Sequence, residues 1–335
     1  MNAETIGAAT LEEWISAAVA APSIYNTQPW RYRLDAETAT LHVRAAPERG
    51  LRHVDPAGRA LHVSVGAAVF NLRVAVTHSG WVPVTRLLPR PEDPRLLATV
   101  RPAGAASQPA TDLRADLYEV IHRRHSSRLP FSGRKLPPLV RTELSEAAHA
   151  EGASLTFPAP VETTRLLRVT AKAEHRNRSD ADRRAESRRW VRRNPDEATD
   201  GGLPRTVLGP QDAHERLPMR DFTAERHPER LAAGAFEYDP VVAVLATAHD
   251  RRADWLRAGQ ALQHVLLVAT AHGLRASLLH QAMEWSDLRR SLSPAPDHTG
   301  HVQMLVRLGY GPEGPATPRH TPRDVVDQRA RGREA

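Results

Sequence analysis

Two stretches of this chain repeat one another, and that repeat limits the possible folds more than any other feature. Gly66–Trp81 and Gly259–Leu274 align without a gap, and each is followed by a segment typical of a strand. Helical periodicity explains the shared apolar positions. It does not explain three further identities: Gly66 with Gly259, Thr77 with Thr270, and Gly80 with Gly273. We therefore favour a duplication over chance similarity between two buried, alanine-rich helices.

Length and residue types narrow the class of protein. The chain has 335 residues, which suggests two to three domain-sized units. It has no cysteine, which removes disulfides, iron–sulfur clusters, cysteine zinc sites and thiol nucleophiles. Apolar runs such as Val241–Ala248 are too short to span a bilayer, and Met1–Thr10 lacks the regions of a signal peptide. We expect a cytoplasmic protein without a membrane partner.

The basic residues have two interpretations. The formal net charge is +7, and Lys135 and Lys172 are the lysines among 46 basic residues. A basic chain can bind nucleic acid, and Arg165–Arg193 is the densest basic stretch. Near-complete use of arginine, however, is typical of a GC-rich coding bias, and acidic residues are interspersed in that stretch. We favour a solvated helix face and expect no nucleic-acid partner.

Periodicity and turn residues predict the order of the elements. In the first part we expect a helix that Thr10 caps and Pro22 ends, strands at Arg31–Leu34 and Thr40–Arg44, a helix at Gly58–Ser79, and strands at Val84–Leu88 and Leu96–Arg101. After a linker at Pro102–Thr111 we expect helices at Asp112–Arg124, Pro138–Glu151, Glu162–Arg193 and Ala253–His272, and strands at Ser154–Phe157, Val241–Thr247 and Val302–Gly309. Asn194–Tyr238 is polar and aperiodic, which is typical of a lid or of a disordered segment.

Several sequence patterns of known cofactor, metal and catalytic sites are incomplete or absent in this chain. The residues Gly309–Gly314 match the GxGxxG pattern of dinucleotide-binding sites. Such a site requires a helix after the pattern, and Pro312, Pro315 and Pro318 prevent that helix. The histidine pairs lack a third ligand at a recognisable spacing, so we expect no metal. We also expect no catalytic side chain, since no nucleophile elbow or triad pattern is present.

The stretch Ala21–Trp30 is the first of two motifs that could carry chemistry. Its two prolines fix the backbone, and Ser23 and Asn26 place short polar groups beside aromatic ones. Such a loop can present backbone amides and these side chains to a flat heterocycle. A helix-ending turn anchored by Trp30 explains the same residues equally well.

The second motif, Arg123–Arg128, combines arginines with serines at an expected helix end. Guanidinium groups and hydroxyls together suit a phosphate group. A basic helix C-terminus that complements the helix dipole is the alternative interpretation.

Together these motifs resemble the nitroreductase superfamily of FMN flavoproteins, and specifically its Acg-type oxidoreductases from actinobacteria. Further marks of the resemblance are Asp55–Arg59, Ala258–Gln260 and the ending Arg307–Gly311 with Ala316–Arg319. The resemblance implies an α+β, nitroreductase-like fold. It also implies that two related halves, residues 1–111 and 112–335, are fused in one chain and mimic the usual homodimer. One chain would then hold one complete flavin site.

The resemblance also implies which residues bind the flavin. The ring system of the flavin would be lined by Pro22, Ser23 and Asn26. Its phosphate, ribityl chain and polar ring edge would be held by Arg124, His125, Ser126 and Arg128. A further phosphate contact would come from Arg319. A lid at about residues 172–238 would cover the site.

The function implied is an FMN-dependent oxidoreductase. NAD(P)H would reduce the flavin, which would then reduce a nitroaromatic, a quinone or a related small-molecule acceptor. The alternative is a flavin-storing or flavin-sequestering protein without turnover, its site covered by the lid.

Overall fold

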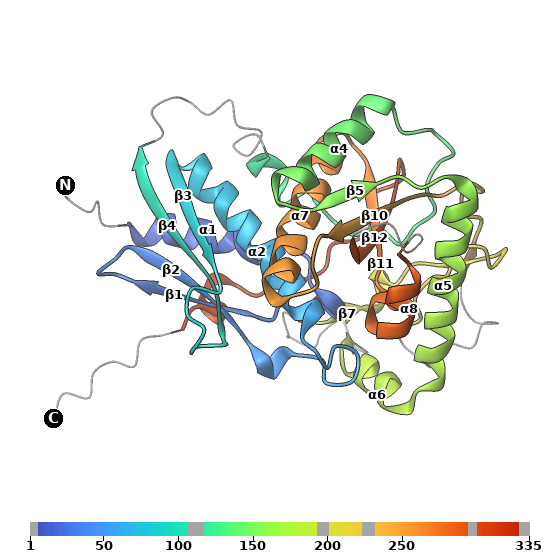
Figure 1. Ribbon diagram of the computed structural model, residues 1–335, viewed down its shortest axis with the longest axis horizontal. Helices are drawn as coiled ribbons and strands as arrows, with labels where there is room; N and C mark the ends of the chain where they lie inside the picture. Colours follow the sequence, from blue (N-terminus) through green and yellow to red (C-terminus); the bar gives the residue numbers. More distant parts are fainter. Residues whose placement is uncertain (1–5, 106–116, 193–200, 223–231, 294–299, 328–335) are drawn as a thin grey trace.

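Two buried helices, α2 (Arg59–His78) and α7 (Arg252–Ala271), cross at the centre of the molecule (Figure 1). The computed structural model describes residues 6–105, 117–192, 201–222, 232–293 and 300–327. Of the helices in those ranges, α2 is the one long and apolar enough to cross a membrane, but 83% of its most apolar window is buried inside the fold. Packing against protein therefore accounts for its apolar surface.

The two helices touch at the repeated glycines. A Cβ on Gly66 would lie 2.1 Å from the Leu256 carbonyl oxygen, and a Cβ on Gly259 would lie 2.1 Å from the Val63 carbonyl oxygen. Both distances are far inside van der Waals contact, so no side chain fits at either position. The close approach of two backbones requires glycine at both copies of the repeat.

The other repeated residues also have matching roles. Thr77 and Thr270 each donate a hydroxyl hydrogen bond to the carbonyl four residues earlier, at 3.0 and 2.7 Å. Gly80 and Gly273 follow the two helix ends with φ of +85° and +71°, the left-handed conformation that favours glycine. The identities that periodicity left unexplained thus correspond to equivalent local structure in α2 and α7.

Each central helix is flanked by a four-stranded antiparallel sheet. The first sheet contains β1 (Trp30–Asp35), β2 (Thr40–Ala45), β3 (Trp81–Leu87) and β4 (Leu96–Ala105) in the order β1-β2-β4-β3. The second contains β5 (Ser154–Thr156), β10 (Val241–Thr247), β11 (Arg275–Leu279) and β12 (His301–Gly309) in the order β5-β10-β12-β11. A helix precedes each sheet, α1 (Ala8–Val19) or α4 (Pro138–Ala150). The two halves therefore share one topology.

The halves differ in what joins their first two strands. A turn connects β1 to β2, whereas β5 and β10 are separated by α5 (Pro160–Ser179), α6 (Ala181–Arg189), β6 (Val191–Arg192), β7 (Leu203–Pro204), β8 (Gln211–Asp212) and β9 (Ala233–Gly234). We call residues 201–222 the inserted segment. A second apolar cluster includes Leu166 and Leu167 of α5, Val242 and Val244 of β10, and Leu288 of α8 (Ser286–Ser291).

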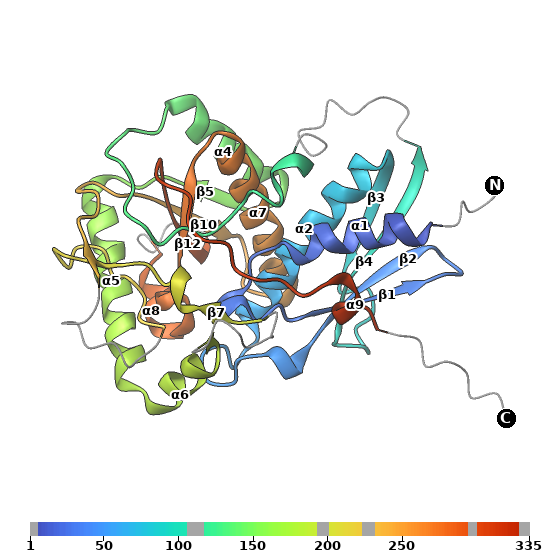
Figure 2. The ribbon, with the colours of Figure 1, turned by 180° about the vertical axis from the view of Figure 1, so that it is seen from behind.

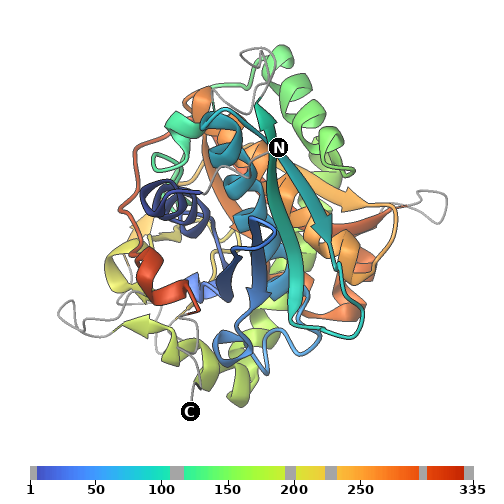
Figure 3. The same ribbon diagram turned by 90° about the vertical axis from the view of Figure 1, so that its left-hand side faces the viewer.

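The C-terminal arm crosses from the second half to the first (Figure 2). After β12 it passes the pocket described below and ends in α9 (Pro322–Val325), which packs against α1 and β1 (Figure 3). The amide of Asp327 donates to the Tyr32 carbonyl at 2.8 Å, beside a parallel bridge between Tyr32 and Val326. The edge of the first sheet is thereby covered by the other end of the chain.

Four expectations about local structure are wrong. Thr10 lies inside α1, which begins one turn earlier at Ala8 with Gly7 as its N-cap and no side-chain cap. The helix expected over Glu162–Arg193 breaks at Asp180, whose carboxylate accepts from the Arg183 amide and caps α6.

The third error is the helix expected over Asp112–Arg124. Within the described part, residues 117–124 form a 3-10 turn at Tyr118–Val120 and further turns, because Ser126 next pairs as a bridge with Ala276 of β11 and extends the chain. Residues 106–116 lie outside the described ranges. The fourth error is the start of the linker expected at Pro102, because β4 pairs with β3 and extends to Ala105. The expected linker end and the boundary between 111 and 112 stay predictions.

Candidate functional site

A pocket opens where the two halves, the inserted segment and the C-terminal arm meet. It encloses about 950 Å³ of empty space, its open mouth included. Its apolar lining comes from both halves: Ala60, Val63 and Ala67 of α2, Leu262 of α7, Leu278 of β11 and Met304 of β12. The lining is mostly apolar with a few polar groups, which is typical of small-molecule sites.

The predicted loop at 21–30 forms one wall of this pocket. Pro22, Ser23 and Asn26 line it. The Ser23 hydroxyl accepts from the Gln28 amide at 2.9 Å. Tyr25, Asn26 and Gln28 have φ of 51°, 56° and 50°, so three residues with side chains adopt the left-handed conformation. Such strain persists only where the surroundings impose it, and it is common at ligand sites.

Asn26 ties three segments together. Its amide nitrogen donates to the Gly202 carbonyl at 3.0 Å and to the Pro318 carbonyl at 2.8 Å, and its amide oxygen accepts from Arg319 at 2.8 Å. The Gly202 amide also donates to the Asn26 carbonyl at 3.1 Å. Asn26 thus lines the pocket while its side chain holds the inserted segment and the C-terminal arm against the loop.

Two arginines beside the pocket have no carboxylate partner among the described residues. Arg124 is buried, 3% exposed, and donates from Nη2 to the Ala20 carbonyl at 3.1 Å. Arg319 is half-buried, lines the pocket and donates to Asn26, Thr317 and Pro318. The Nε atom of each is buried and has no hydrogen-bond partner in the part of the chain that the structure describes.

The pKa values of these two arginines are lowered, as expected for cations that lie out of water without a carboxylate nearby. Burial lowers the pKa of Arg124 to about 9, with a further contribution from the charge of Arg319. Burial also lowers the pKa of Arg319 to about 10. Buried charges are normally paired, so this end of the pocket suits an anion.

The remaining residues of the second motif also reach the pocket. His125 and Ser126 line it, and burial followed by the charges of Arg124 and Arg319 lowers the pKa of His125. Arg128 lines it too, but its Nη1 donates to the Val207 carbonyl at 3.1 Å and its guanidinium lies 4.8 Å from the Phe222 ring centroid. Arg128 therefore contacts the inserted segment as well as the pocket.

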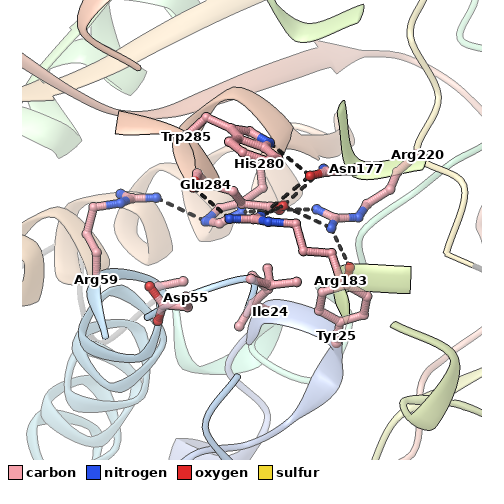
Figure 4. A network of polar contacts seen from close by, with 12 residues as sticks. Ile24, Tyr25, Asp55, Arg59, Asn177, Arg183, Arg220, His280, Glu284 and Trp285 are labelled. Atoms are coloured by element: carbon pink, nitrogen blue, oxygen red, sulfur yellow. Dashed lines mark hydrogen bonds and ion pairs between the residues drawn. The ribbon is translucent and has the colours of Figure 1, made fainter. Parts of the chain in front are cut away.

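A buried polar network that the sequence did not reveal lies at another side of the pocket (Figure 4). Glu284, with its side chain fully buried, accepts from Arg220, from Arg183 at 3.3 Å, from Asn177 at 3.0 Å and from His280 Nδ1 at 3.0 Å. Arg220 also donates to the Tyr25 hydroxyl. Three members of the network, Tyr25, Arg220 and His280, line the pocket.

The charges in this network fix the protonation of its members. Burial opposes ionisation of Glu284, but Arg220 and His280 outweigh it and hold the pKa at about 2. Arg59 Nη2 lies 3.0 Å from His280 Nε2, and arginine can only donate. Nε2 is therefore the acceptor and Nδ1 carries the proton toward Glu284. Burial lowers the pKa of His280 to about 4, so this ring is neutral at pH 7.

The structure thus brings together the two motifs and the C-terminal arginine. The lining includes Pro22, Ser23, Asn26, His125, Ser126, Arg128 and Arg319, and Arg124 lies behind it. Their roles toward a flavin stay predictions. Sequence reasoning missed Arg220, His280 and Glu284. His280 and Glu284 sit four residues apart, but no pattern links them to Arg220, which comes from the aperiodic region.

Comparisons with known proteins identify the family of this chain. The model of the nitroreductase family matches residues 121–310. A Mycobacterium tuberculosis protein named Rv3127 is 31% identical over 322 residues, covering 95% of this chain and 91% of its own. The "Putative NAD(P)H nitroreductase Rv3131" of the same organism is 30% identical over 334 residues, covering 98% and 94%. The solved FMN- and NADPH-dependent nitroreductase NfnB of Sphigopyxis sp. strain HMH is 16% identical with a TM-score of 0.40, covering 64% and 98%. The chain belongs to the nitroreductase family.

Proposed function

We propose that this chain is an FMN-dependent oxidoreductase that uses NAD(P)H to reduce a nitroaromatic, a quinone or a related small molecule. Membership of the nitroreductase family supports this reaction class. The observation that carries the cofactor assignment is the pair of a buried Arg124 and a half-buried Arg319 beside the pocket, neither with a carboxylate partner among the described residues. A phosphate ester supplies the missing negative charge and accepts from guanidinium N–H groups.

The residues present fit the flavin in two further respects. The apolar lining from α2, α7, β11 and β12 suits a flat ring system, and the hydroxyl of Ser126 and the ring of His125 add polar groups to the wall of the same pocket. When bound, FMN accepts hydride from NAD(P)H and passes the electrons to an acceptor. The chain's own residues bind and orient the cofactor, exclude water and set the local charge.

One chain is proposed to complete the site, because the loop at 21–28 and the residues at 124–128 both belong to it and face one pocket. The common topology of the two halves supports a fused equivalent of a homodimer. The inserted segment is proposed as part of the lid, since Leu203, Arg220 and Phe222 line the pocket. The cytoplasmic location also stays a prediction.

The decisive experiment compares FMN with riboflavin. Arg124→Gln and Arg319→Gln should weaken FMN about ten- to a hundredfold and riboflavin little, because riboflavin has no phosphate to lose. Arg123→Gln, an exposed neighbour, is the matched control and should leave both affinities unchanged. Isothermal titration of flavin-free protein measures them. Equal weakening of both flavins would mean that these arginines only support the fold.

A second measurement separates an enzyme from a storage protein. The purified protein should contain about one FMN per chain, determined from its visible spectrum and from light scattering. Rapid bleaching of that spectrum on stopped-flow mixing with NADPH or NADH, followed by reoxidation with a nitroaromatic, supports turnover. A flavin that stays oxidised supports storage instead.

A further inference from the structure

The side-chain amide of Asn26 is held in one orientation by protein groups. Its two N–H groups donate to the carbonyls of Gly202 and Pro318, and its oxygen accepts from Nη1 of Arg319 at 2.8 Å. Carbonyls only accept and a guanidinium only donates, so these partners exclude the flipped amide. Asn26 is 4% exposed, and asparagine tolerates its φ of 56° better than most residues do. The amide therefore has no N–H left for the acceptor atoms of a flavin ring.

The guanidinium of Arg319 is held on one side and open on the other. Its Nη1 donates to Asn26, to the Pro318 carbonyl at 3.1 Å, and to the carbonyl and hydroxyl of Thr317. These are its hydrogen bonds within the described ranges, so Nε and Nη2 make none there. Nε and Nη2 share one edge of the planar group, and such an edge binds a phosphate through two parallel hydrogen bonds.

The hold on Nη1 determines where the open edge lies. Arg124 is close enough for its pKa to be lowered by the charge of Arg319. Two cations repel each other, so without Asn26 we expect the Arg319 guanidinium to rotate away from Arg124. A phosphate would then have to immobilise a mobile side chain, which costs about two- to tenfold in affinity.

We propose that Asn26 is a positioning residue for the cofactor's phosphate: it holds Arg319 so that the Nε and Nη2 edge stays beside Arg124, and it thereby makes the pocket prefer FMN to riboflavin. The inference rests on the proposed function and deepens it, because it places the action of Asn26 at the phosphate, through Arg319, instead of at the ring. Asn26 also bonds Gly202 of the inserted segment, so the test has to separate the two roles.

The test measures the affinities of flavin-free protein for FMN and for riboflavin by isothermal titration, and the readout is their ratio. Asn26→Gly removes the amide and adopts the left-handed backbone without strain, and it should lower the FMN preference about two- to tenfold. Asn26→Asp keeps the size of the side chain but sets a carboxylate on Arg319. That carboxylate competes for the guanidinium and repels the phosphate, so this variant should lower the preference further, by at least about tenfold.

Tyr25→Phe is the matched control. Tyr25 precedes Asn26 in the same loop, lines the pocket and bonds Arg220 of the inserted segment, but it shares no hydrogen bond with Arg319 among the described residues. The control therefore loosens the inserted segment and should leave the FMN preference unchanged. In an Arg319→Gln background Asn26→Gly should also leave it unchanged, because the group through which the amide acts is gone.

Equal weakening of both flavins by the Asn26 variants overturns the inference, because the amide then serves the ring or the fold. Failure of both variants to fold overturns it for the same reason, and so does an equal drop in preference in the Arg319→Gln background. A selective loss of FMN in Arg319→Gln with an unchanged preference in both Asn26 variants overturns the inference alone. A wild-type protein that binds no FMN, or binds it no better than riboflavin, overturns the proposed cofactor assignment and this inference with it.

Discussion

Buried charges at the residue scale fall into two kinds in this protein. Glu284 is satisfied by four donors from three separate parts of the chain, whereas Arg319, which lines the pocket, and Arg124, which lies behind it, have no counter-charge among the described residues. A satisfied buried carboxylate holds segments in place, and removing one of its partners costs stability. An unsatisfied guanidinium beside a cavity is instead the signature of a ligand site.

His280 gives a pH-dependent prediction. Its pKa is about 4 in the folded chain and near 6.5 when unfolded, so the folded state binds fewer protons between these values. The stabilisation by neutral His280 is therefore present above pH 6.5 and is lost as pH falls toward 4. The difference in free energy of unfolding between wild type and His280→Gln should shrink over this window by up to about 3 kcal/mol.

Urea denaturation at pH 7.5, 5.5 and 4.5 measures that difference. The comparison with the variant is needed because Asp55, with its pKa raised to about 6, acts in the opposite sense. A difference that stays constant across the three pH values would show that His280 has the same pKa in the folded and unfolded states.

At the scale of elements, the crossing of α2 and α7 depends on two glycines. Gly66→Ala or Gly259→Ala places a methyl group 2.1 Å from a carbonyl oxygen of the other helix, where only a backbone shift can relieve the clash. We expect a loss of stability at or above the upper end of the roughly 1–3 kcal/mol that overpacking usually costs. Thermal unfolding measures it. Gly133→Ala is the control, because its Cβ would meet nothing within 4 Å, and an equally stable Gly66→Ala protein would contradict the crossing.

The regular elements were largely predictable from sequence, for a physical reason. Strand β10 is a continuous apolar run, and the helices α2 and α7 are apolar on most sides, so their sequences predict the buried elements that the structure shows. The helix expected before Arg124 failed because tertiary pairing of Ser126 with Ala276 extends the chain there. The network of His280, Glu284 and Arg220 could not be predicted from the sequence either. Its partners lie up to 64 positions apart, and no local pattern encodes such contacts.

At the scale of the whole molecule, two related halves have become unequal. Both carry the same strand order around a central helix, but only the first contributes a Pro-Ser loop to the pocket, and only the second carries the long insertion between its first two strands. The C-terminal arm then returns to the first half and joins the loop through Asn26. The pocket is therefore built from four separate segments, and the inserted segment can be removed without cutting the other three.

Removal of the inserted segment tests whether it is a lid. Replacing residues 194–230 by a short Gly/Ser connector takes away Leu203, Arg220 and Phe222 from the pocket wall and the Gly202 contact of Asn26, but it leaves Arg124, Arg319 and the apolar lining in place. Because the phosphate contacts are proposed to lie outside the segment, FMN affinity should change little. Opening the pocket should speed flavin reduction by NAD(P)H in stopped-flow mixing. Loss of FMN would make the segment part of the cofactor site, and an unchanged reduction rate would show that it does not limit access.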